Sequence, residues 1–529
     1  MKRRNFIRNA ALTTVGLPGA LNGFSLTAHS DDSLLGQFFP PGTMNDHILV
    51  VIQMAGGNDG LNTVIPLDQY SKYVNARTNI AIAQSKVLPL TGTAATGLHP
   101  SLTGLRDMYN DGKLCIIQSA GYPTPSFSHF RATDIWMTAA NSDVYLNDGW
   151  LGRYLNGEYA GYPVGYPTAD MPDPLGIQFG SGTSLALLGP SSPMGYTISD
   201  PNAFINNADG GEDAVPNTTP MGQKLQYVRD VSKQAQVYYN AVKNAYNVAG
   251  NANLATYPTN TLTNQLKIVA RLINGGLKTK VYVVSFGGFD THAGQTNTSD
   301  TSTGNHAALM ATLGNTIQAF HNDLKLMNKD QRVLGMTFSE FGRRIKSNAS
   351  GGTDHGYAAP MFVFGSQVTG GIIGTSPNLP TVAGVNDNIA MQTDFRSIYL
   401  SIMKRWLCQD STSLQQIMLQ NFTEVNICNN TNCAPLGRAA GGQQTELVTN
   451  SPNPVLSSTN VTFITAGGHT LLQLVSPQGT VVATLMETNF DRPQTINRSI
   501  DLSGYKPGMY YLSFQNGNNR QMKPIIKSQ

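Results

Sequence analysis

The sequence predicts an α/β domain, with a mostly parallel sheet flanked by helices, followed by a small all-β sandwich. Up to about residue 436, short apolar runs that stop at glycine or polar residues alternate with helical stretches, as in α/β proteins. Beyond it, short alternating runs are separated by turn residues at regular intervals, which is typical of a sandwich. A chain of 529 residues is long enough for both domains.

The elements of the first domain are predicted along residues 44–430. Residues 48–53 form a β-branched apolar run that stops at glycines, as a buried parallel strand does. Further strands are predicted within 113–121, 279–292, 332–344 and 359–365, and helices within 127–140, 224–249, 262–275 and 306–328. Sites in such sheets form at the carboxyl ends of strands. Residues 431–447 are predicted to be a linker and residues 448–529 the second domain.

The composition indicates an exported protein. Charged residues make up 13% of the chain, the net charge is +3, and no basic stripe is present, so we expect no nucleic-acid partner. In residues 1–28, Arg3 and Arg4 precede an apolar stretch that is too short to span a bilayer. This segment resembles a twin-arginine export signal, with an ordinary secretory signal as the alternative. We therefore expect the twin-arginine or Sec machinery as a partner and the periplasm as a stage in transit.

The end of the chain resembles the type A C-terminal sorting domain of the type IX secretion system of Bacteroidetes. The matching stretches are "SPNP", "LVSPQGTVV", "IDLSGYKPGMYYLSF" and "KPIIK", in this order. The resemblance implies recognition by the type IX machinery, removal of the tail, and secretion or attachment to the cell surface.

The cysteines fit an exported protein. Cys428 and Cys433 lie close together in "CNNTNC" and predict a small disulfide loop. Cys115 lies in an apolar run and is predicted to be buried in the core.

Acids and histidines recur directly after the predicted strands. The stretches "GGNDGLN", "FDTHAG", "SEFGRR" and "GTDHG" contain the candidate metal ligands Asp59, Asp290, His292, Glu340, Asp354 and His355. Carboxylate oxygen and imidazole nitrogen suit divalent metal ions. We therefore predict a divalent metal, zinc in the first place, with manganese or calcium as alternatives.

Each stretch also has a purely structural interpretation. Asp59 before a glycine could belong to a turn, and Glu340 could pair with an arginine. Asp290 and His292 could cap a helix, and Asp354 and His355 could cap the element that follows them. Repetition of one placement, the end of a strand, favours the metal site.

Two further residues are candidates for chemistry. Ser128 stands at the start of a predicted helix, where free N–H groups favour an anion, although it could be only an N-cap. Arg343 could bind a phosphate or sulfate group. His129 is interpreted as a core histidine or as support for a ligand, and His47, His99, His306 and His321 as structural.

Residues 44–430 resemble a bacterial family of exported proteins of unknown function, related to the sulfatase and alkaline phosphatase superfamily. The shared motifs are "GGNDGLN", "SHFRATDIW", "GWLGRYL", "FDTH", "SEFGR" and "GTDHG". The resemblance implies an alkaline-phosphatase-like fold with a metal centre at the sheet edge. It implies that Ser128 is the nucleophile and that Asp59 matches the acid after the first strand. It also implies that Asp290 and His292 match an acid–histidine pair, and that His355 matches a metal-binding histidine late in the sequence.

The chain also departs from the superfamily. It has Ser339-Glu340 where many members have Asp-His, and it lacks the Cys/Ser-x-Pro-x-Arg signature of sulfatases. The sequence therefore predicts a secreted metal-dependent hydrolase of phosphate esters, with sulfate esters second. Its substrate would be a small molecule or a surface polymer, and Asp354 would be either a ligand or the orienting partner of a metal-bound histidine. The alternative is a surface or binding protein that keeps the fold without the chemistry.

Overall fold

The computed structural model describes most of the chain as two compact units. The larger contains residues 45–155 and 167–434, and the smaller contains residues 435–529. The described residues are 19–21, 24–26, 46–159, 162–163, 166–168, 171–198, 235–248, 250–429, 446–451, 453–465, 468–476, 480–490, 494–516 and 519–528. Apart from two short paired strands, β1 (Gly19–Leu21) and β2 (Phe24–Leu26), the predicted export signal lies outside them.

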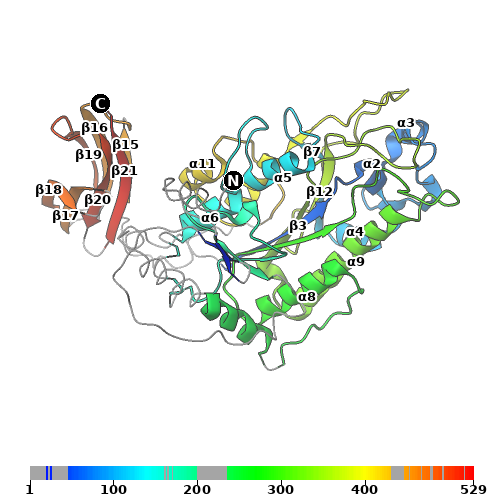
Figure 1. The fold of residues 1–529 in the computed structure, drawn as a ribbon, viewed down its shortest axis with the longest axis horizontal. Helices are drawn as coiled ribbons and strands as arrows, with labels where there is room; N and C mark the ends of the chain where they lie inside the picture. Colours follow the sequence, from blue (N-terminus) through cyan, green and yellow to red (C-terminus); the bar gives the residue numbers. More distant parts are fainter. Residues whose placement is uncertain are drawn as a thin grey trace, which may run out of the picture. The chain divides into compact units, whose positions relative to one another are not determined.

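A nine-stranded sheet forms the centre of the larger unit, in the order β13-β7-β12-β11-β3-β10-β8-β9, with β14 also paired to β7 (Figure 1). The strands are β3 (Ile48–Ala55), β7 (Leu114–Gly121), β8 (Gly176–Phe179), β9 (Gly195–Ile198), β10 (Val281–Gly287), β11 (Val333–Phe338), β12 (Ala359–Phe364), β13 (Gly371–Ile373) and β14 (Thr393–Asp394). A separate small sheet contains β4 (Val64–Pro66), β5 (Leu88–Leu90) and β6 (Thr93–Leu98).

The direction of the central strands decides where the loops meet. Strand β3 pairs in parallel with β10 and β11, whereas β12 runs antiparallel to both β11 and β7. The carboxyl ends of β3, β7, β10 and β11 therefore lie at one edge of the sheet. The amino end of β12 lies at that same edge, so the loop before β12 joins the loops after the other four strands.

Helices cover both faces of this sheet (Figure 1). Helices α4 (Thr103–Asn110), α8 (Thr261–Asn274) and α9 (Asn305–Leu326) lie on one face, where their apolar residues pack with alternate residues of β3 and β10. Helices α5 (His129–Thr138) and α10 (Phe395–Arg405) lie on the other. There Trp136 stacks on Phe338 of β11 and on Phe395. The prediction of a mostly parallel sheet between helices is confirmed.

The remaining helices of this unit are short. They include α2 (Gly60–Thr63), α3 (Tyr70–Ala76), α6 (Trp150–Glu158) and α11 (Ser411–Met418). Of the helix predicted over 224–249, residues 235–246 are helical and the part before residue 235 lies outside the described residues. No helix in the described part of the chain combines the length and the apolar character needed to cross a membrane.

The smaller unit is a sandwich of two antiparallel sheets, as predicted. One has the order β15-β16-β19 and the other β18-β17-β20-β21. The strands are β15 (Glu446–Ser451), β16 (Ser458–Thr465), β17 (Gly468–Val475), β18 (Val481–Phe490), β19 (Gln494–Asp501), β20 (Gly508–Asn516) and β21 (Asn519–Lys527). Phe463 of one sheet lies 4.9 Å from Phe514 of the other, ring centroid to ring centroid, within one apolar core.

The disulfide loop predicted from "CNNTNC" does not form. Cys428 is buried as a thiol, whereas Cys408 is disulfide-bonded. Cys433 lies outside the described residues. Cys428 also forms an isolated β-bridge with Val368. Cys115 is buried, as predicted.

Candidate metal centre

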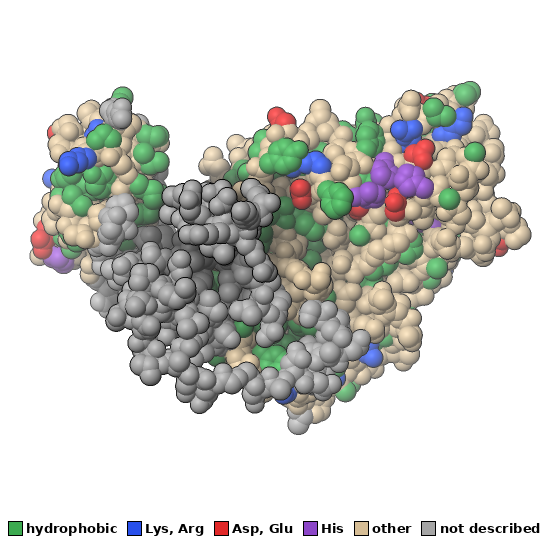
Figure 2. All heavy atoms as spheres, viewed as in Figure 1, with side chains coloured by type: hydrophobic (Ala, Val, Ile, Leu, Met, Phe, Trp, Pro, Cys, Tyr) green, Lys and Arg blue, Asp and Glu red, His purple; other side chains and the backbone are tan. Residues whose placement is uncertain are grey.

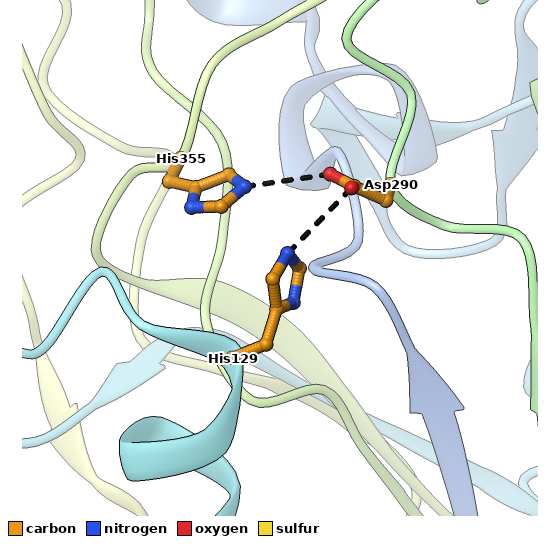
Figure 3. A group of neighbouring side chains, drawn as sticks. All are labelled: His129, Asp290 and His355. Carbon is orange, nitrogen blue, oxygen red and sulfur yellow. Dashed lines mark hydrogen bonds and ion pairs between the residues drawn. The ribbon is translucent and has the colours of Figure 1, made fainter.

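The loops at one edge of the central sheet bring three separate chain segments together. His129 is the first residue of α5, Asp290 follows β10, and His355 precedes β12. One potential ligand atom from each of these residues lies within 4.8 Å of those of the other two. Figure 3 shows both imidazoles directed toward the carboxylate of Asp290. Nε2 of His355 lies 3.4 Å from Oδ1, and Nε2 of His129 lies 3.6 Å from Oδ2.

His292 adds a third imidazole to this group. Its Nε2 lies 3.2 Å from Oδ1 of Asp290 and 2.9 Å from Nε2 of His355. We call His129, Asp290, His292 and His355 the edge cluster. Two residues of this cluster, Asp290 and His292, come from one loop, so the short "FDTH" stretch supplies half of it.

The other ring nitrogen of each histidine faces an oxygen atom. Nδ1 of His129 lies 2.8 Å from Oε1 of Glu340, and Nδ1 of His355 lies 2.8 Å from the carbonyl oxygen of Phe127. Nδ1 of His292 lies 3.2 Å from Oδ1 of Asp354. In the tautomer with the proton on Nδ1, each ring donates to its oxygen and keeps the Nε2 lone pair for a metal ion. This is the outer-shell arrangement by which proteins orient metal-binding imidazoles.

The spacing of the potential ligand atoms suits one small cation. Zinc bonds of about 2.0–2.1 Å in a tetrahedral site place neighbouring ligand atoms about 3.3 Å apart. The contacts of the three Nε2 atoms with Asp290, and that between His292 and His355, range from 2.9 to 3.6 Å. The donor atoms of His129, Asp290 and His355 all lie within 4.8 Å of one another, close enough to bind one metal ion together.

The electrostatic environment favours the ligand forms of two cluster residues. Partial burial raises the pKa of Asp290, but the hydrogen bond and charge of Arg343 outweigh it and hold that pKa below its usual value. Burial lowers the pKa of His355, and the nearby Arg343 lowers it further. A charged carboxylate and a neutral imidazole are the forms that bind metal.

Asp59 lies apart from this cluster, although it was predicted to be a ligand. Its side chain is fully buried, and Nη1 of Arg77 lies 2.7 Å from Oδ1 and 2.5 Å from Oδ2. Nε2 of Gln295 donates to Oδ2 at 2.5 Å. Burial raises the pKa of Asp59, but Arg77 outweighs it and the pKa is lowered. Both oxygens are already hydrogen-bonded, so the structure favours the structural interpretation of this acid.

The same buried network reaches the loops of the cluster. Oε1 of Gln295 accepts from the hydroxyls of Thr291 and Thr353, each at 3.0 Å. Thr291 precedes His292, and Thr353 lies two residues before His355. Asp59 is therefore linked by hydrogen bonds through Gln295 to the loops that carry His292 and His355.

Arg343 also differs from its predicted role in anion binding. Its side chain has no exposed surface. The guanidinium donates to the carbonyl oxygens of Gly56, Gly57 and Thr353 and, at 2.6 Å, to Oδ1 of Asp290. A buried guanidinium with these partners has no surface for a phosphate in solution. It orders the loop after β3 and holds Asp290 instead.

Glu340 and Asp354 each contact the Nδ1 atom of a histidine in the edge cluster. Oε1 of Glu340 accepts from the backbone N–H of Gly56 at 2.8 Å, in addition to its contact with His129, and its side chain is 3% exposed. Glu340 does not pair with either neighbouring arginine. Asp354 is held by Nδ2 of Asn348 at 3.2 Å. Both acids are placed to orient imidazoles, which for Asp354 is one of the two predicted roles.

Ser128 is the N-cap residue of α5 and is exposed. Its side chain makes no capping hydrogen bond, so its role as the nucleophile stays a prediction. His129 follows it directly and belongs to the edge cluster, whereas the sequence suggested only a core or supporting histidine. The signal that could have identified His129 is its position, because it follows β7 just as Asp290 follows β10.

A second pair of histidines lies in the buried region near Asp59. Nε2 of His306 lies 3.4 Å from Oδ1 of Asn58, and the rings of His99 and His306 meet edge to face at 5.5 Å. Burial lowers the pKa of His99 to about 3 and that of His306 to about 4. Both histidines are therefore neutral near neutral pH, and their structural role stays a prediction.

Two family models match the chain. Residues 221–397 match a family described as protein of unknown function DUF1501, and residues 451–528 match the secretion system C-terminal sorting domain. These matches confirm both resemblances. The sorting domain marks a secreted or cell-surface protein that the type IX machinery recognises. None of the curated proteins matches the chain.

Solved structures similar to this chain include a protein in the alkaline phosphatase superfamily. One, from Vibrio parahaemolyticus, is 7% identical with a TM-score of 0.30, over 94% of this chain and 86% of that one. The lipoteichoic acid synthase LtaP of Listeria monocytogenes is 9% identical with a TM-score of 0.27, over 74% and 78%. Ps i-CgsB, solved with k-i-k-neocarrahexaose, is 11% identical with a TM-score of 0.30, over 70% and 74%. At these values the likeness says nothing about the chemistry of the site.

Proposed function

We propose that this protein is an exported hydrolase of phosphate esters that works with one divalent metal ion bound by the edge cluster. The observation that supports it most is the convergence of three Nε2 atoms on the carboxylate of Asp290, with every Nδ1 facing an oxygen. Sulfate esters are the second substrate class. The family resemblance of the motifs supports the same reaction class.

The donor set favours zinc or manganese over calcium. Imidazole nitrogen suits transition ions, whereas calcium takes six to eight oxygen ligands. A second metal ion has no such support among the described residues, because Asp59 and Glu340 are held by Arg77, Gln295, Gly56 and His129. We therefore propose one metal site rather than two.

The chain's own residues would divide the work as follows. A bound metal lowers the pKa of a coordinated water or hydroxyl and stabilises charge on a phosphoryl oxygen. The exposed amino end of α5 presents its N–H groups and the positive end of the helix dipole to the anionic group. The hydroxyl of Ser128, at that helix end, is the candidate nucleophile. Glu340, Asp354 and Arg343 would hold the ligands in place without touching the substrate.

The test is to measure metal content by elemental analysis, together with turnover on parallel panels of phosphate and sulfate esters. Wild type, Asp290→Asn, His355→Ala and Ser128→Ala would be compared. The matched control is Asp300→Asn, since Asp300 is an exposed aspartate in the same loop whose partner is Lys86 at 2.6 Å. We expect about one equivalent of metal in wild type, Ser128→Ala and the control, and at least a 100-fold loss of metal affinity in the two ligand variants.

Turnover distinguishes a hydrolase from a binding protein that has the same fold. Phosphate ester hydrolysis that is lost in Asp290→Asn and in Ser128→Ala supports the proposal. Bound metal without turnover on either panel would instead make the protein a metal-dependent binding protein. Wild-type protein that binds no metal would refute the proposal altogether.

A further inference from the structure

We propose that a pocket beside the edge cluster binds one aromatic ring of the substrate, so that aryl phosphate esters are the preferred substrate class. This inference rests on the proposed function for the ester group, and on the pocket alone for the ring. The pocket has a volume of about 180 Å³ and is lined by Gly121, Tyr122, Pro123, Thr124, Pro125, Trp136, Tyr357, Ala358 and Met391.

The size and lining of the pocket suit a single flat ring. An apolar cavity of about 150 Å³ is enough to hold benzene, so about 180 Å³ accommodates one six-membered ring with a small substituent. Two hydroxyl groups of the lining are already engaged. The hydroxyl of Tyr122 accepts from the N–H of Ser126 at 3.1 Å, and that of Thr124 donates to the carbonyl of Pro123 at 2.7 Å. A sugar ring would find few partners here.

The pocket belongs to the same loops as the candidate metal centre. The loop after β7 supplies one wall and continues to Ser128 and His129, while Tyr357 and Ala358 follow His355. The two loops are joined by the stacked rings of Phe127 and Tyr357, whose centroids are 5.2 Å apart, and by the bond from His355 to the Phe127 carbonyl. A ring in this pocket would therefore place an attached ester near the edge cluster.

The back of the pocket is formed by packed aromatic rings and its rim is exposed. Trp136 stacks on Phe395 with ring centroids 4.1 Å apart, and Tyr122 meets Phe395 edge to face. At the rim, Tyr357 and Met391 are each 37% exposed, and Phe127, which stacks on Tyr357, is 39% exposed. Figure 2 shows hydrophobic side chains beside the histidines on this face. Exposed apolar groups around a concave site are typical of a ligand-binding region.

Two measurements test the ring pocket, and the first does not depend on catalysis. Phenol binding would be followed by nuclear magnetic resonance in wild type, in Asp290→Asn, in Met391→Trp, which fills the pocket, and in the control Leu254→Ala, an exposed leucine elsewhere. We expect phenol to bind wild type, Asp290→Asn and the control alike, and binding to fall at least 10-fold in Met391→Trp. Equal binding to Met391→Trp, or no binding to wild type, would overturn the proposal.

The second measurement compares kcat/KM for phenyl phosphate and methyl phosphate. Burying one ring favours phenyl phosphate by about 10- to 100-fold, and Met391→Trp should lower kcat/KM for phenyl phosphate more than for methyl phosphate. Phenol is also the better leaving group, so the change in preference between wild type and Met391→Trp is the decisive quantity. Equal kcat/KM for the two esters would overturn the aryl preference. Phenol binding without any ester turnover would keep the ring pocket and reject the hydrolase, so the two failures are distinguishable.

Discussion

Asp290 and Asp59 follow neighbouring parallel strands of one sheet, yet the structure uses them in opposite ways. The side chain of Asp290 is 49% exposed and faces three imidazoles, whereas that of Asp59 is fully buried and faces Arg77 and Gln295. Both are aspartates with a lowered pKa and an arginine partner. Residue type and strand position alone therefore do not separate a ligand-binding acid from a structural one.

The difference lies in how the hydrogen-bonding capacity is filled. The donors around Asp59 are fixed parts of the protein, so nothing is left for a metal. Around Asp290, Arg343 is the fixed donor, and the other groups that face the carboxylate are imidazole nitrogens, which can exchange a proton for a metal ion. The surroundings of Asp59 are therefore complete, whereas those of Asp290 leave room for a ligand.

The largest effect on stability is expected from breaking the buried pair. Asp59→Asn leaves Arg77 charged and buried without its counter-ion, which should destabilise the fold by about 3–5 kcal/mol. The free energy of unfolding from urea titrations measures this. Asp46→Asn is the matched control, because Asp46 lies 3.7 Å from Arg332 with 65% of its side chain exposed. Its loss should cost no more than about 1 kcal/mol.

Metal content per folded molecule tests the same difference between Asp59 and Asp290. Asp59→Asn should keep its metal as long as it remains folded, unlike Asp290→Asn. Loss of metal at unchanged stability in Asp59→Asn would show that Asp59 is a ligand after all, and the distinction between the two acids would fail.

The buried histidines predict a weaker stability at acid pH. His99 and His306 have pKa values of about 3 and about 4 in the folded protein, against about 6.5 when unfolded. Between these values the unfolded chain binds more protons, so stability falls as pH drops below about 6.5. From pH 7.5 to 5.5 the two histidines together should remove about 3 kcal/mol.

Urea titrations at both pH values measure this loss, with His99→Gln to isolate one histidine. The variant should lose about half as much stability on acidification as the wild type. The control is His469→Gln, at an exposed histidine paired with Glu487 in the sandwich. An unchanged pH dependence in His99→Gln would mean that His99 is not kept neutral by burial.

The smallest expected effect concerns a residue that orients a ligand. Glu340→Gln keeps the size of the side chain but removes the charge that faces Nδ1 of His129, which should weaken metal affinity by about 10- to 100-fold. Competition with a chelator measures the affinity, and the free energy of unfolding checks the fold. Complete loss of metal at unchanged stability would make Glu340 a direct ligand, as the sequence first suggested.

The fold was predictable because its signals are local and repeated. Apolar runs such as residues 48–53 and 359–365 identify buried strands from their composition, and the sorting domain has its own motifs. The direction of β12 was not predictable, since antiparallel pairing leaves no mark in six apolar residues. The edge cluster was predicted only in part. Asp290, His292 and His355 were identified by their positions, but the partners of Asp59, Glu340 and Arg343 are set by residues far away in the sequence, such as Arg77 and His129.

The reversed direction of β12 has a consequence for how the protein matures. His355 reaches the edge cluster only after a late strand has paired between β7 and β11, which are themselves far apart along the chain. Contacts of such long sequence separation close late in folding because of their loop-closure entropy. A metal ion bound there would stabilise only the finished sheet by mass action. Resistance of the metal-loaded chain to proteases would then report completed folding rather than local order.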